Sequence, residues 1–178
     1  MPEIFSVGHG ARSLEEFLAI LREVKIAVLA DVRSFPGSRR YPQFGAKALA
    51  GALADEGIAY VHLVGLGGRR DPRDDSPHRA LRVAAFRGYA DHMATDDFAH
   101  DHARLTEIAR ARRTAFMCAE TLWWRCHRRM IADRLVVDGW TVTHLLGPGK
   151  SEPHVLWNTA RIVDGHLIYD EGTLALPS

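Results

Sequence analysis

The stretch "IAVLADVR", residues 26–33, is an almost unbroken apolar run that ends in charged residues. Such a run is typical of a parallel strand that helices cover on both faces. Four more short apolar runs, each followed by polar or glycine-rich residues, occur along the chain: "IFSVGHG", "IAYVHL", "TAFMCAE" and "TVTHLL". The sequence therefore predicts about five strands of this kind.

Helical patterns separate the predicted strands. In "SLEEFLAILREV", Ser13 and Glu16 have the spacing of a capping box, and the apolar residues that follow form a stripe. The other helical patterns are "KALAGALADEG", "FRGYADHM", "DDFAHDHARLTEIARARR" and "WRCHRRMIADRLVVDG". This alternation predicts a three-layer α/β fold, with helices on both faces of a mainly parallel sheet. Asp164 and Gly165 predict the turn of a small C-terminal hairpin.

The length of 178 residues fits one domain with a sizeable core, so residues 1–178 are predicted to form a single α/β domain. The formal net charge is +1, which argues against a generally basic surface for nucleic acid but leaves room for a local basic patch. Arg outnumbers Lys by 20 to 3. Because Arg is the better bidentate ligand for phosphate and carboxylate, the positions of the arginines matter more than their number.

Two features point to the cytoplasm. The chain has two cysteines, Cys118 and Cys126, which are too few for a disulfide framework, and free thiols suit a reducing compartment. The stretch "MPEIFSVGHG" lacks the pattern of a signal peptide, and no apolar run is long enough to span a membrane. We therefore expect a cytoplasmic protein with no membrane partner. The sequence leaves the oligomeric state open.

The ends of the predicted strands carry the candidate ligand-binding residues, because α/β sheets bind ligands beyond the carboxyl ends of their strands. These ends are polar, charged or glycine-rich segments, namely residues 8–10, 31–33, 67–70, 118–120 and 147–150. Seven arginines lie in loops or at a helix start on this edge: Arg33, Arg39, Arg40, Arg69, Arg70, Arg125 and Arg128. We expect the strand-end arginines to form one concave site for an anionic group of the substrate.

Six segments carry a resemblance to a known family. They are "SVGHGARSLEEF", "DVRSFPGSRRYPQF", "YVHLVGLGGRR", "AFRGYADHM", "MCAETLWWRCHRRMIADRL" and "HLLGPG". Together they resemble the family called "domain of unknown function 488", from the first strand to Gly149. The family pattern usually has Ser or Thr where this chain has Gly10. The resemblance implies a fold and a set of candidate residues, but no particular reaction.

Asp31 and Glu120 are candidates for acid and base catalysis, because each follows an apolar strand. Two carboxylates at neighbouring strand ends can divide these roles when their surroundings separate their pKa values. Hydrolysis of a glycosidic bond needs such a pair, or one carboxylate that activates water. A structural pair between Asp31 and Arg33 is an equal alternative. His9, between two glycines after the first strand, is the third catalytic candidate.

The stretch "CAETLWWRCHRR", residues 118–129, supports several interpretations. Cys126, near a helix start and among arginines, is a candidate thiolate of low pKa, although its helical spacing also fits a core residue. Rhodaneses and cysteine phosphatases have five residues between cysteine and arginine, whereas six separate Cys118 from Arg125. The lack of CxxC or CxxH spacing argues against structural zinc. His127 is a candidate to hold a carboxylate or phosphate, and a hydrogen bond that caps the sheet is the alternative.

Aromatic side chains lie beside arginines in two separate loops. Trp123 precedes Arg125, and Tyr41 follows Arg40. Stacking on a base combined with contacts to phosphate uses this mixture of side chains. Interior packing is the alternative for a tryptophan. The mixture favours a substrate that contains both a base and a phosphate.

The favoured function is a hydrolase that acts on a nucleotide, or on nucleic acid with an accessible base, with cleavage of an N-glycosidic bond as the working reaction. Arginines hold the phosphate, Cys126 and His127 join the substrate-binding residues, and Asp31 or Glu120 activates water. Neither a metal nor another cofactor is required. Two alternatives stay open: a thiol-dependent enzyme of the rhodanese or phosphatase type that uses Cys118 or Cys126, and a non-catalytic module that binds anions.

Overall fold

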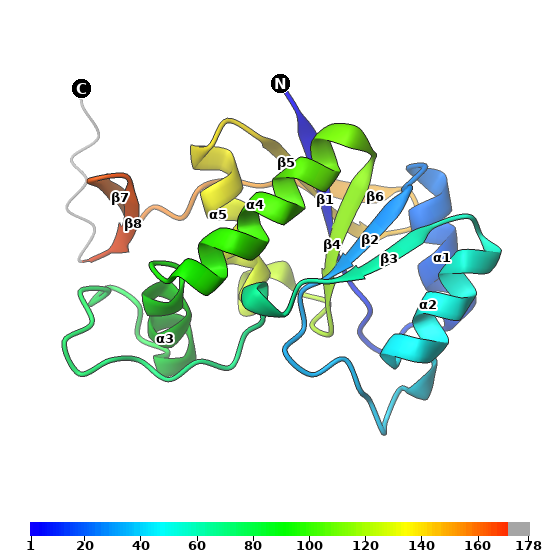
Figure 1. The fold of residues 1–178 in the computed structure, drawn as a ribbon, viewed down its shortest axis with the longest axis horizontal. Coiled ribbons are helices and arrows are strands. Elements are labelled where there is room, and N and C mark those ends of the chain that lie inside the picture. The colour runs from blue at the N-terminus through cyan, green and yellow to red at the C-terminus, as the bar shows by residue number, and fades with distance from the viewer. Residues whose placement is uncertain (171–178) are drawn as a thin grey trace.

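The computed structural model describes residues 1–170 and shows the predicted parallel sheet (Figure 1). Five parallel strands lie in the order β3-β2-β4-β1-β5, and β6 follows at the edge next to β5. Their bounds are β1 Glu3–Gly8, β2 Val28–Asp31, β3 Ala59–His62, β4 Thr114–Cys118, β5 Thr141–Gly147 and β6 Lys150–Pro153. The strands β2 and β4 are buried along their whole length, as expected for strands covered on both faces.

The strand β6 is present in the structure but was not predicted from the sequence. It pairs antiparallel with β5, and His144 lies opposite Glu152 in this register. Residues 147–150, expected as a loop at a strand end, instead lie in the turn of this hairpin, where Gly149 has a φ of 67°. The strand's sequence, "KSEP", lacks the alternation of apolar and polar side chains by which a strand is recognised.

Helices cover both faces of the sheet, which gives three layers (Figure 1). The helices are α1 Leu14–Glu23, α2 Ala46–Asp55, α3 Ala84–His92, α4 Asp96–Ala111 and α5 Arg128–Val137. On one face of the sheet, Phe17 of α1 and Leu53 of α2 belong to one buried apolar cluster. The helices α3, α4 and α5 contribute to a second buried cluster on the other face. No helix among residues 1–170 has both the length and the apolar character needed to cross a membrane. The predicted three-layer α/β architecture is confirmed.

Two local predictions are also confirmed. The backbone N–H of Glu16 donates to Ser13 Oγ at 3.1 Å, so Ser13 caps α1. The C-terminal hairpin consists of β7 Ala160–Val163 and β8 His166–Tyr169. Asp164 and Gly165 connect these strands with φ values of 49° and 79°, and a tight hairpin turn of type I′ needs positive φ at both central positions.

The strand order places the carboxyl ends of β1, β2 and β4 side by side. After β3 the chain returns to the middle of the sheet, where β4 inserts between β2 and β1. Gly8 then lies beside Cys118, and Asp31 lies beside Met117. The loop after β4 passes close to Gly8, where an added Cβ would lie 2.0 Å from the carbonyl oxygen of Glu120. Such a reversal of strand order is where α/β sheets bind ligands.

Candidate active site

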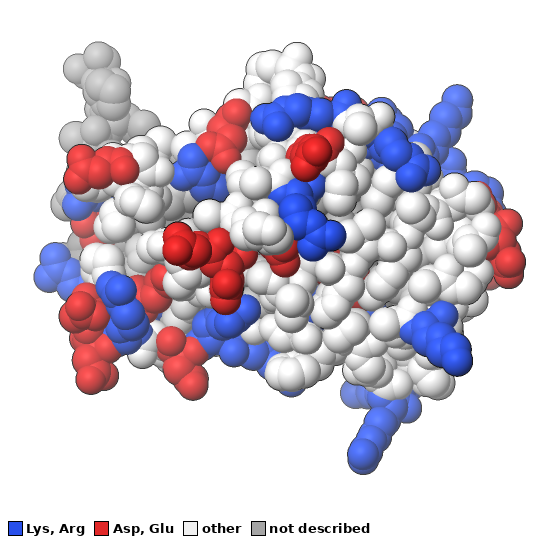
Figure 2. Space-filling view, viewed as in Figure 1, with Lys and Arg blue, Asp and Glu red and all other residues white. Residues whose placement is uncertain are grey.

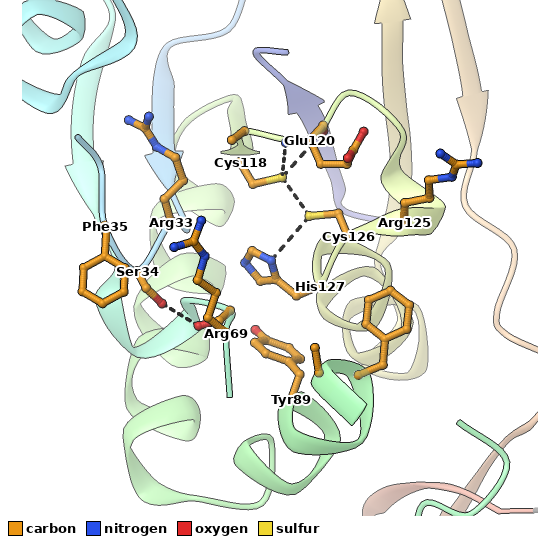
Figure 3. Close-up of a pocket in the computed structure, with 14 residues that line it drawn as sticks. Arg33, Ser34, Phe35, Arg69, Tyr89, Cys118, Glu120, Arg125, Cys126 and His127 are labelled. Atoms are coloured by element: carbon orange, nitrogen blue, oxygen red, sulfur yellow. Dashed lines mark hydrogen bonds between the residues drawn. The ribbon is translucent and has the colours of Figure 1, made fainter. Parts of the chain in front are cut away.

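A pocket of about 250 Å³ opens at the carboxyl ends of β2 and β4 (Figure 3). Two cysteines and a histidine lie at its centre. Figure 3 shows Arg33 and Arg69 on one side of the sulfur atoms and Arg125 on the other. Three aromatic side chains also line the pocket, namely Phe35, Phe86 and Tyr89. A cavity of this size is at the small end of ligand pockets and suits a small molecule.

The sulfur atoms of Cys118 and Cys126 face each other inside the pocket at 2.8 Å (Figure 3). Cys118 is the last residue of β4, and Cys126 lies between the short helix η3, Trp123–Arg125, and α5. The backbone N–H of Glu120 donates to Cys118 Sγ at 3.3 Å, and that of Arg128 donates to Cys126 Sγ at 3.4 Å. Both thiols are free and buried. The fold therefore joins two cysteines that the sequence separates by a loop.

The guanidinium of Arg128 lies beneath these sulfur atoms and is 1% exposed. Its Nε donates to Cys118 Sγ at 3.0 Å, its Nη1 to Ser6 Oγ at 2.7 Å, and its Nη2 to the carbonyl oxygen of Glu120 at 2.5 Å. No carboxylate among residues 1–170 forms an ion pair with it. A buried cation is costly without an anion. The cysteine pair is the ionisable group in contact with Arg128, and it balances this charge when one of its thiols ionises.

This position corrects the predicted contact between Arg128 and substrate. The side chain does not line the pocket, and its donors are used by protein atoms. Its charge still affects the pocket, because it lowers the pKa of Cys126, which lines the pocket. Arg128 therefore acts on the cysteines and not directly on a ligand.

The two thiols differ in acidity. Burial opposes ionisation of Cys126, but the hydrogen bond from Cys118 and the charge of Arg128 outweigh it and lower the pKa of Cys126 to about 7. Burial raises the pKa of Cys118 well above its ordinary value, and the hydrogen bond and charge of Cys126 add to this effect. Two interacting groups lose their protons in two separate steps. Above about pH 7 the pair therefore carries a single negative charge, which lies on Cys126.

His127 is oriented toward Cys126 by a backbone carbonyl. Its Nε2 lies 2.9 Å from the carbonyl oxygen of Val32, which only accepts, so Nε2 carries the hydrogen of the neutral ring. Burial lowers the pKa of His127 and keeps the ring neutral. Its Nδ1 then presents a lone pair to Cys126 Sγ at 3.4 Å. Gly68 permits this approach, because an added Cβ would lie 2.9 Å from Nδ1.

A chain of buried hydrogen bonds leads from Arg128 away from the pocket. Ser6 Oγ accepts from Arg128, so its own hydrogen goes to His144 Nδ1 at 3.0 Å. His144 Nε2 then donates to His154 Nδ1 at 2.9 Å, and His154 Nε2 donates to Asp133 Oδ1 at 2.7 Å. Burial lowers the pKa of His144 to about 2, so the neutral form in this chain is stable. The chain fixes the orientation of Arg128.

Asp31 has the structural role that was the alternative to catalysis. Its carboxylate is fully buried and accepts from Arg33 Nε at 2.9 Å and Nη2 at 2.7 Å. The hydroxyl of Tyr60 donates to the same carboxylate at 2.5 Å. Asp31 does not line the pocket. The predicted catalytic role of Asp31 therefore has no support from the geometry, because its oxygen atoms are enclosed by protein donors.

His9 is also a supporting residue in this structure. It is 2% exposed, and its ring stacks on Phe44 with centroids 4.4 Å apart. Its Nδ1 lies 2.9 Å from the carbonyl oxygen of Gly10, and its Nε2 faces Arg33 Nη1 at 3.4 Å. Burial lowers the pKa of His9. His9 packs against Arg33 and lines a neighbouring hollow instead of the pocket that holds the cysteines.

Three of the predicted arginines line the same pocket, as one concave anion site requires: Arg33, Arg69 and Arg125. Arg33 is already paired with Asp31. Within the part of the chain that the structure describes, neither Arg69 nor Arg125 forms an ion pair. Arg69 and Arg125 are therefore the two arginines available to an anionic ligand in the pocket.

The remaining predicted arginines are spread more widely. Arg40 and Tyr41 line the neighbouring hollow, and the Arg40 guanidinium lies 5.5 Å from the centre of the Tyr41 ring. Arg39 is exposed and lines neither cavity. Arg70 Nε donates to the carbonyl oxygen of Gly67 at 3.2 Å, outside the pocket. Figure 2 shows basic side chains projecting at the lower edge, where Figure 1 places the segment between β2 and α2.

Trp123 does not offer its ring to a base in the pocket. Its ring is stacked on His144, with centroids 4.2 Å apart and planes 1° apart. Its Nε1 donates to Glu152 Oε1 at 2.5 Å. The predicted stacking role of Trp123 is thus replaced by packing against β5 and β6, because the strand β6, which the sequence did not reveal, supplies the partner Glu152.

The aromatic residues that do line the pocket were not predicted. Phe35 follows β2 and is 71% exposed, and its place directly after "DVRS" is a signal that sequence analysis can use. Phe86 and Tyr89 lie three residues apart on α3 and so share one face of that helix. No local pattern links α3 to the pocket, because only the path of the preceding loop brings it there.

Among residues 1–170, Glu120 is the one carboxylate that lines the pocket. It is exposed, and its Oε1 accepts from the backbone N–H of Leu122 at 3.0 Å. It also lines the neighbouring hollow together with Arg69. Glu120 therefore keeps the position of a candidate catalytic carboxylate. Residues 1–170 contain no group of three or more His, Cys, Asp or Glu side chains placed to bind a metal ion.

The fold and the pocket define an α/β protein with a cysteine pair and arginines at the carboxyl edge of its parallel sheet. A family model described as "Domain of unknown function DUF488" matches residues 13–135. The chain belongs to this family, as its motifs indicate. The matched region includes both cysteines, Arg128 and the three arginines of the pocket. Comparison with curated proteins gave no match, and comparison with solved structures gave none either.

Proposed function

We propose that the pocket is the active site of a thiol-dependent enzyme, in which Cys126 is the nucleophile for a small anionic substrate. One observation supports this above the others: the buried cation of Arg128 contacts the cysteine pair, and that pair lines the pocket. A thiolate is the nucleophilic form of cysteine, and a cationic neighbour makes it available near neutral pH. Thiol chemistry is thus better supported than the hydrolase that the sequence favours.

The neighbours of Cys126 supply the other functions that such an enzyme needs. His127 Nδ1, 3.4 Å from the sulfur, is placed to relay the proton between Cys126 and a leaving group, and its ring is neutral at rest. Arg69 and Arg125 attract the anionic group of the substrate. Phe35 offers an exposed ring to a planar or apolar part of the same molecule. Cys126 attacks an electrophilic atom of the substrate, the bond from that atom to its leaving group breaks, and the leaving group departs with a proton. Water or a small thiol then takes the group that is bound to the Cys126 sulfur and restores the free cysteine.

Alkylation tests this proposal. At pH 7, iodoacetamide and the anion iodoacetate are both expected to label Cys126 first, and Cys126→Ser removes the fast-reacting thiol. Because Arg69 and Arg125 attract anions, the ratio of the iodoacetate rate to the iodoacetamide rate is expected to fall in Arg69→Gln and in Arg125→Gln. The expected fall is about two- to fivefold, as for partly exposed ion pairs, and it shrinks with added salt. Mass spectrometry of peptides identifies the labelled cysteine.

Arg104→Gln on α4 is the matched control, because Arg104 lies outside the pocket near Asp101. It is expected to leave the ratio of rates unchanged. Labelling of Cys118 before Cys126, or a ratio unaffected by either pocket substitution, would contradict the proposed site.

A second candidate is the carboxylate-based hydrolase of a nucleotide or nucleic acid. The observation that favours it is Glu120, an exposed carboxylate that shares both cavities with Arg69. In this candidate Glu120 activates water for cleavage of an N-glycosidic bond, and the arginines hold the phosphate. Asp31 takes no part, because its carboxylate is enclosed by Arg33 and Tyr60.

The variant Glu120→Gln separates the two candidates. Because Glu120 is exposed, the thermal midpoint is expected to stay within about 2 °C of the parent protein. If Glu120 activates water, hydrolysis of nucleotides drops by ~100-fold or more, and alkylation of both cysteines leaves it intact. Glu107→Gln, an exposed position on α4, serves as the control. Nucleotide binding without turnover in any variant would instead support the non-catalytic anion-binding module.

A further inference from the structure

We propose that Cys118 and Cys126 form a two-electron redox centre, in which Cys126 reduces a small hydroperoxide and Cys118 then closes a disulfide. The inference rests on the proposed role of Cys126 as nucleophile. It adds a substrate class and a role for Cys118, which nucleophilic catalysis alone does not need.

The two sulfur atoms are close enough to form a bond after a small movement. They lie 2.8 Å apart, whereas the bond of a disulfide measures about 2.05 Å, so less than about 1 Å of movement joins them. Arg128 holds both ends of the loop between them, through Nε to Cys118 and through its backbone N–H to Cys126. The two sulfur atoms are therefore within reach of each other for bond formation.

The pocket gives small molecules access to both cysteines. Cys118 is 2% exposed and Cys126 is 6% exposed, and both reach solvent through the pocket of about 250 Å³. A protein disulfide is too large to enter this cavity, so the oxidant is a small molecule. Of the two sulfur atoms, Cys126 has the neutral His127 beside it and is the more acidic, so it reacts first. Its partner is in place to attack the oxidised sulfur.

The electrons and protons balance in two steps. The thiolate of Cys126 attacks the outer oxygen of the hydroperoxide ROOH, an S–O bond forms, the O–O bond breaks, and RO⁻ takes a proton from water and leaves as ROH. Cys126 is then a sulfenic acid. Cys118 loses its proton to water and attacks the sulfur of Cys126, the S–O bond breaks, and the departing hydroxide takes a proton to become water. Two equivalents of a small external thiol reduce the disulfide again and are themselves oxidised to their disulfide.

The charge of Arg128 makes this disulfide easy to reduce. The reduced pair carries one negative charge that balances the buried guanidinium, whereas the disulfide carries none. Oxidation therefore leaves a buried cation without its anion, which favours the reduced form. Stabilisation of the reduced form is what makes a dithiol pair a strong oxidant in its disulfide state. Such a pair suits a catalytic cycle better than a permanent cross-link.

The experiment treats the full chain with an equivalent amount of hydrogen peroxide, blocks free thiols with iodoacetamide and analyses the peptides by mass spectrometry. We expect the parent protein to lose two hydrogens and to give a Cys118–Cys126 linked peptide. Cys118→Ser is expected to stop at the sulfenic acid, which a 1,3-dione traps, and Cys126→Ser is expected to remain reduced. Identical products from the parent and Cys118→Ser would overturn the inference.

A redox titration against mixtures of reduced and oxidised glutathione gives an independent measure. Arg128→Met is expected to make the disulfide about tenfold or more harder to reduce, the change that accompanies one unit of thiol pKa. Arg134→Met on the same helix, where Arg134 pairs with Asp138, is the control and is expected to match the parent. An equilibrium constant unaffected by Arg128→Met would contradict the role given to its charge. If Cys126 were alkylated fast but no disulfide formed, the proposal of a redox centre would be wrong, and the proposal of a thiol-dependent enzyme would still hold.

Discussion

Asp31→Asn is expected to lower the free energy of unfolding by about 3–5 kcal/mol, the cost of removing one partner of a buried ion pair. The carboxylate of Asp31 is fully buried and holds both Nε and Nη2 of Arg33, while Tyr60 donates to it as well. An amide in its place has one oxygen acceptor and leaves the Arg33 guanidinium buried without an anion. The free energy of unfolding of a typical domain is only about 5–15 kcal/mol, so the variant is expected to be close to unfolding at ordinary temperature.

Urea denaturation measures this loss, with Asp55→Asn as the control. Asp55 is the last residue of α2 and is exposed, so its substitution is expected to change the free energy of unfolding by less than about 0.5 kcal/mol. A loss below about 1 kcal/mol for Asp31→Asn would show that the pair with Arg33 is dispensable for folding. That outcome would restore Asp31 as a catalytic candidate.

The sequence predicts the layers of this fold because the information is local. Each strand at the centre of the sheet is a short apolar run, and each helix has an apolar stripe with recognisable ends, such as the Ser13 cap. The rule that ligands bind at carboxyl ends of parallel strands then brings Arg33, Arg69 and Cys118 to one edge. The structure places all three around one pocket. Local pattern and a topological rule are sufficient for that much.

The partners of each side chain could not be predicted, because they come from distant segments. Arg125 and Arg128 are three residues apart, yet one lines the pocket and the other is buried beneath the sulfur atoms. Which of them faces the ligand depends on where α5 begins, and helix boundaries are the least certain feature of a sequence-based prediction. Ser6 and His154, which help to hold Arg128, lie in segments that pairing of β1 with β5 and of β5 with β6 brings together.

The role of Asp31 could not be predicted from the sequence for a different reason. The spacing of Asp31 and Arg33 fits an ion pair and a catalytic carboxylate equally well, because both roles place a charged residue at the end of a buried strand. What separates the roles is Tyr60 on the neighbouring strand β3, whose hydroxyl completes the set of donors around the carboxylate. The register of β2 with β3 decides this contact, and a sequence alone does not give a register between strands that follow different loops.

Arg128→Met is expected to raise the pH at which Cys126 becomes reactive by at least about 1 unit, because the substitution removes the cation that favours the thiolate. The parent protein is expected to show a midpoint near pH 7 in a profile of alkylation rate against pH, in line with the lowered pKa of Cys126. In the variant the thiolate fraction at pH 7, and with it the alkylation rate, falls by about tenfold or more. Arg128→Lys keeps a charge but loses the planar fork that also contacts Ser6 and Glu120, so an intermediate midpoint is expected.

The same substitution is expected to change how stability depends on pH. The pKa of Cys126 is lowered on folding from an ordinary value of 9.0 to about 7. An acid whose pKa falls on folding contributes stability that is fully present above the unfolded value and is lost as the pH falls through the folded value. The free energy of unfolding of the parent protein should therefore rise from about pH 7 toward pH 9, because over this range the unfolded chain keeps the Cys126 proton that the folded protein has lost. Arg128→Met should lose this rise.

Urea denaturation of both proteins at pH 6 and pH 9 measures the difference. At pH 6 the cysteine pair of the parent is largely protonated, so its Arg128 is a buried cation without a full anion, and the parent and the variant are expected to differ least. At pH 9 the thiolate balances Arg128 in the parent alone, and the difference is expected to be greatest. If the difference were the same at both pH values, the charge of Arg128 would be balanced by something other than Cys118 and Cys126. The chemical basis of the thiol enzyme and of the redox centre would then be lost together.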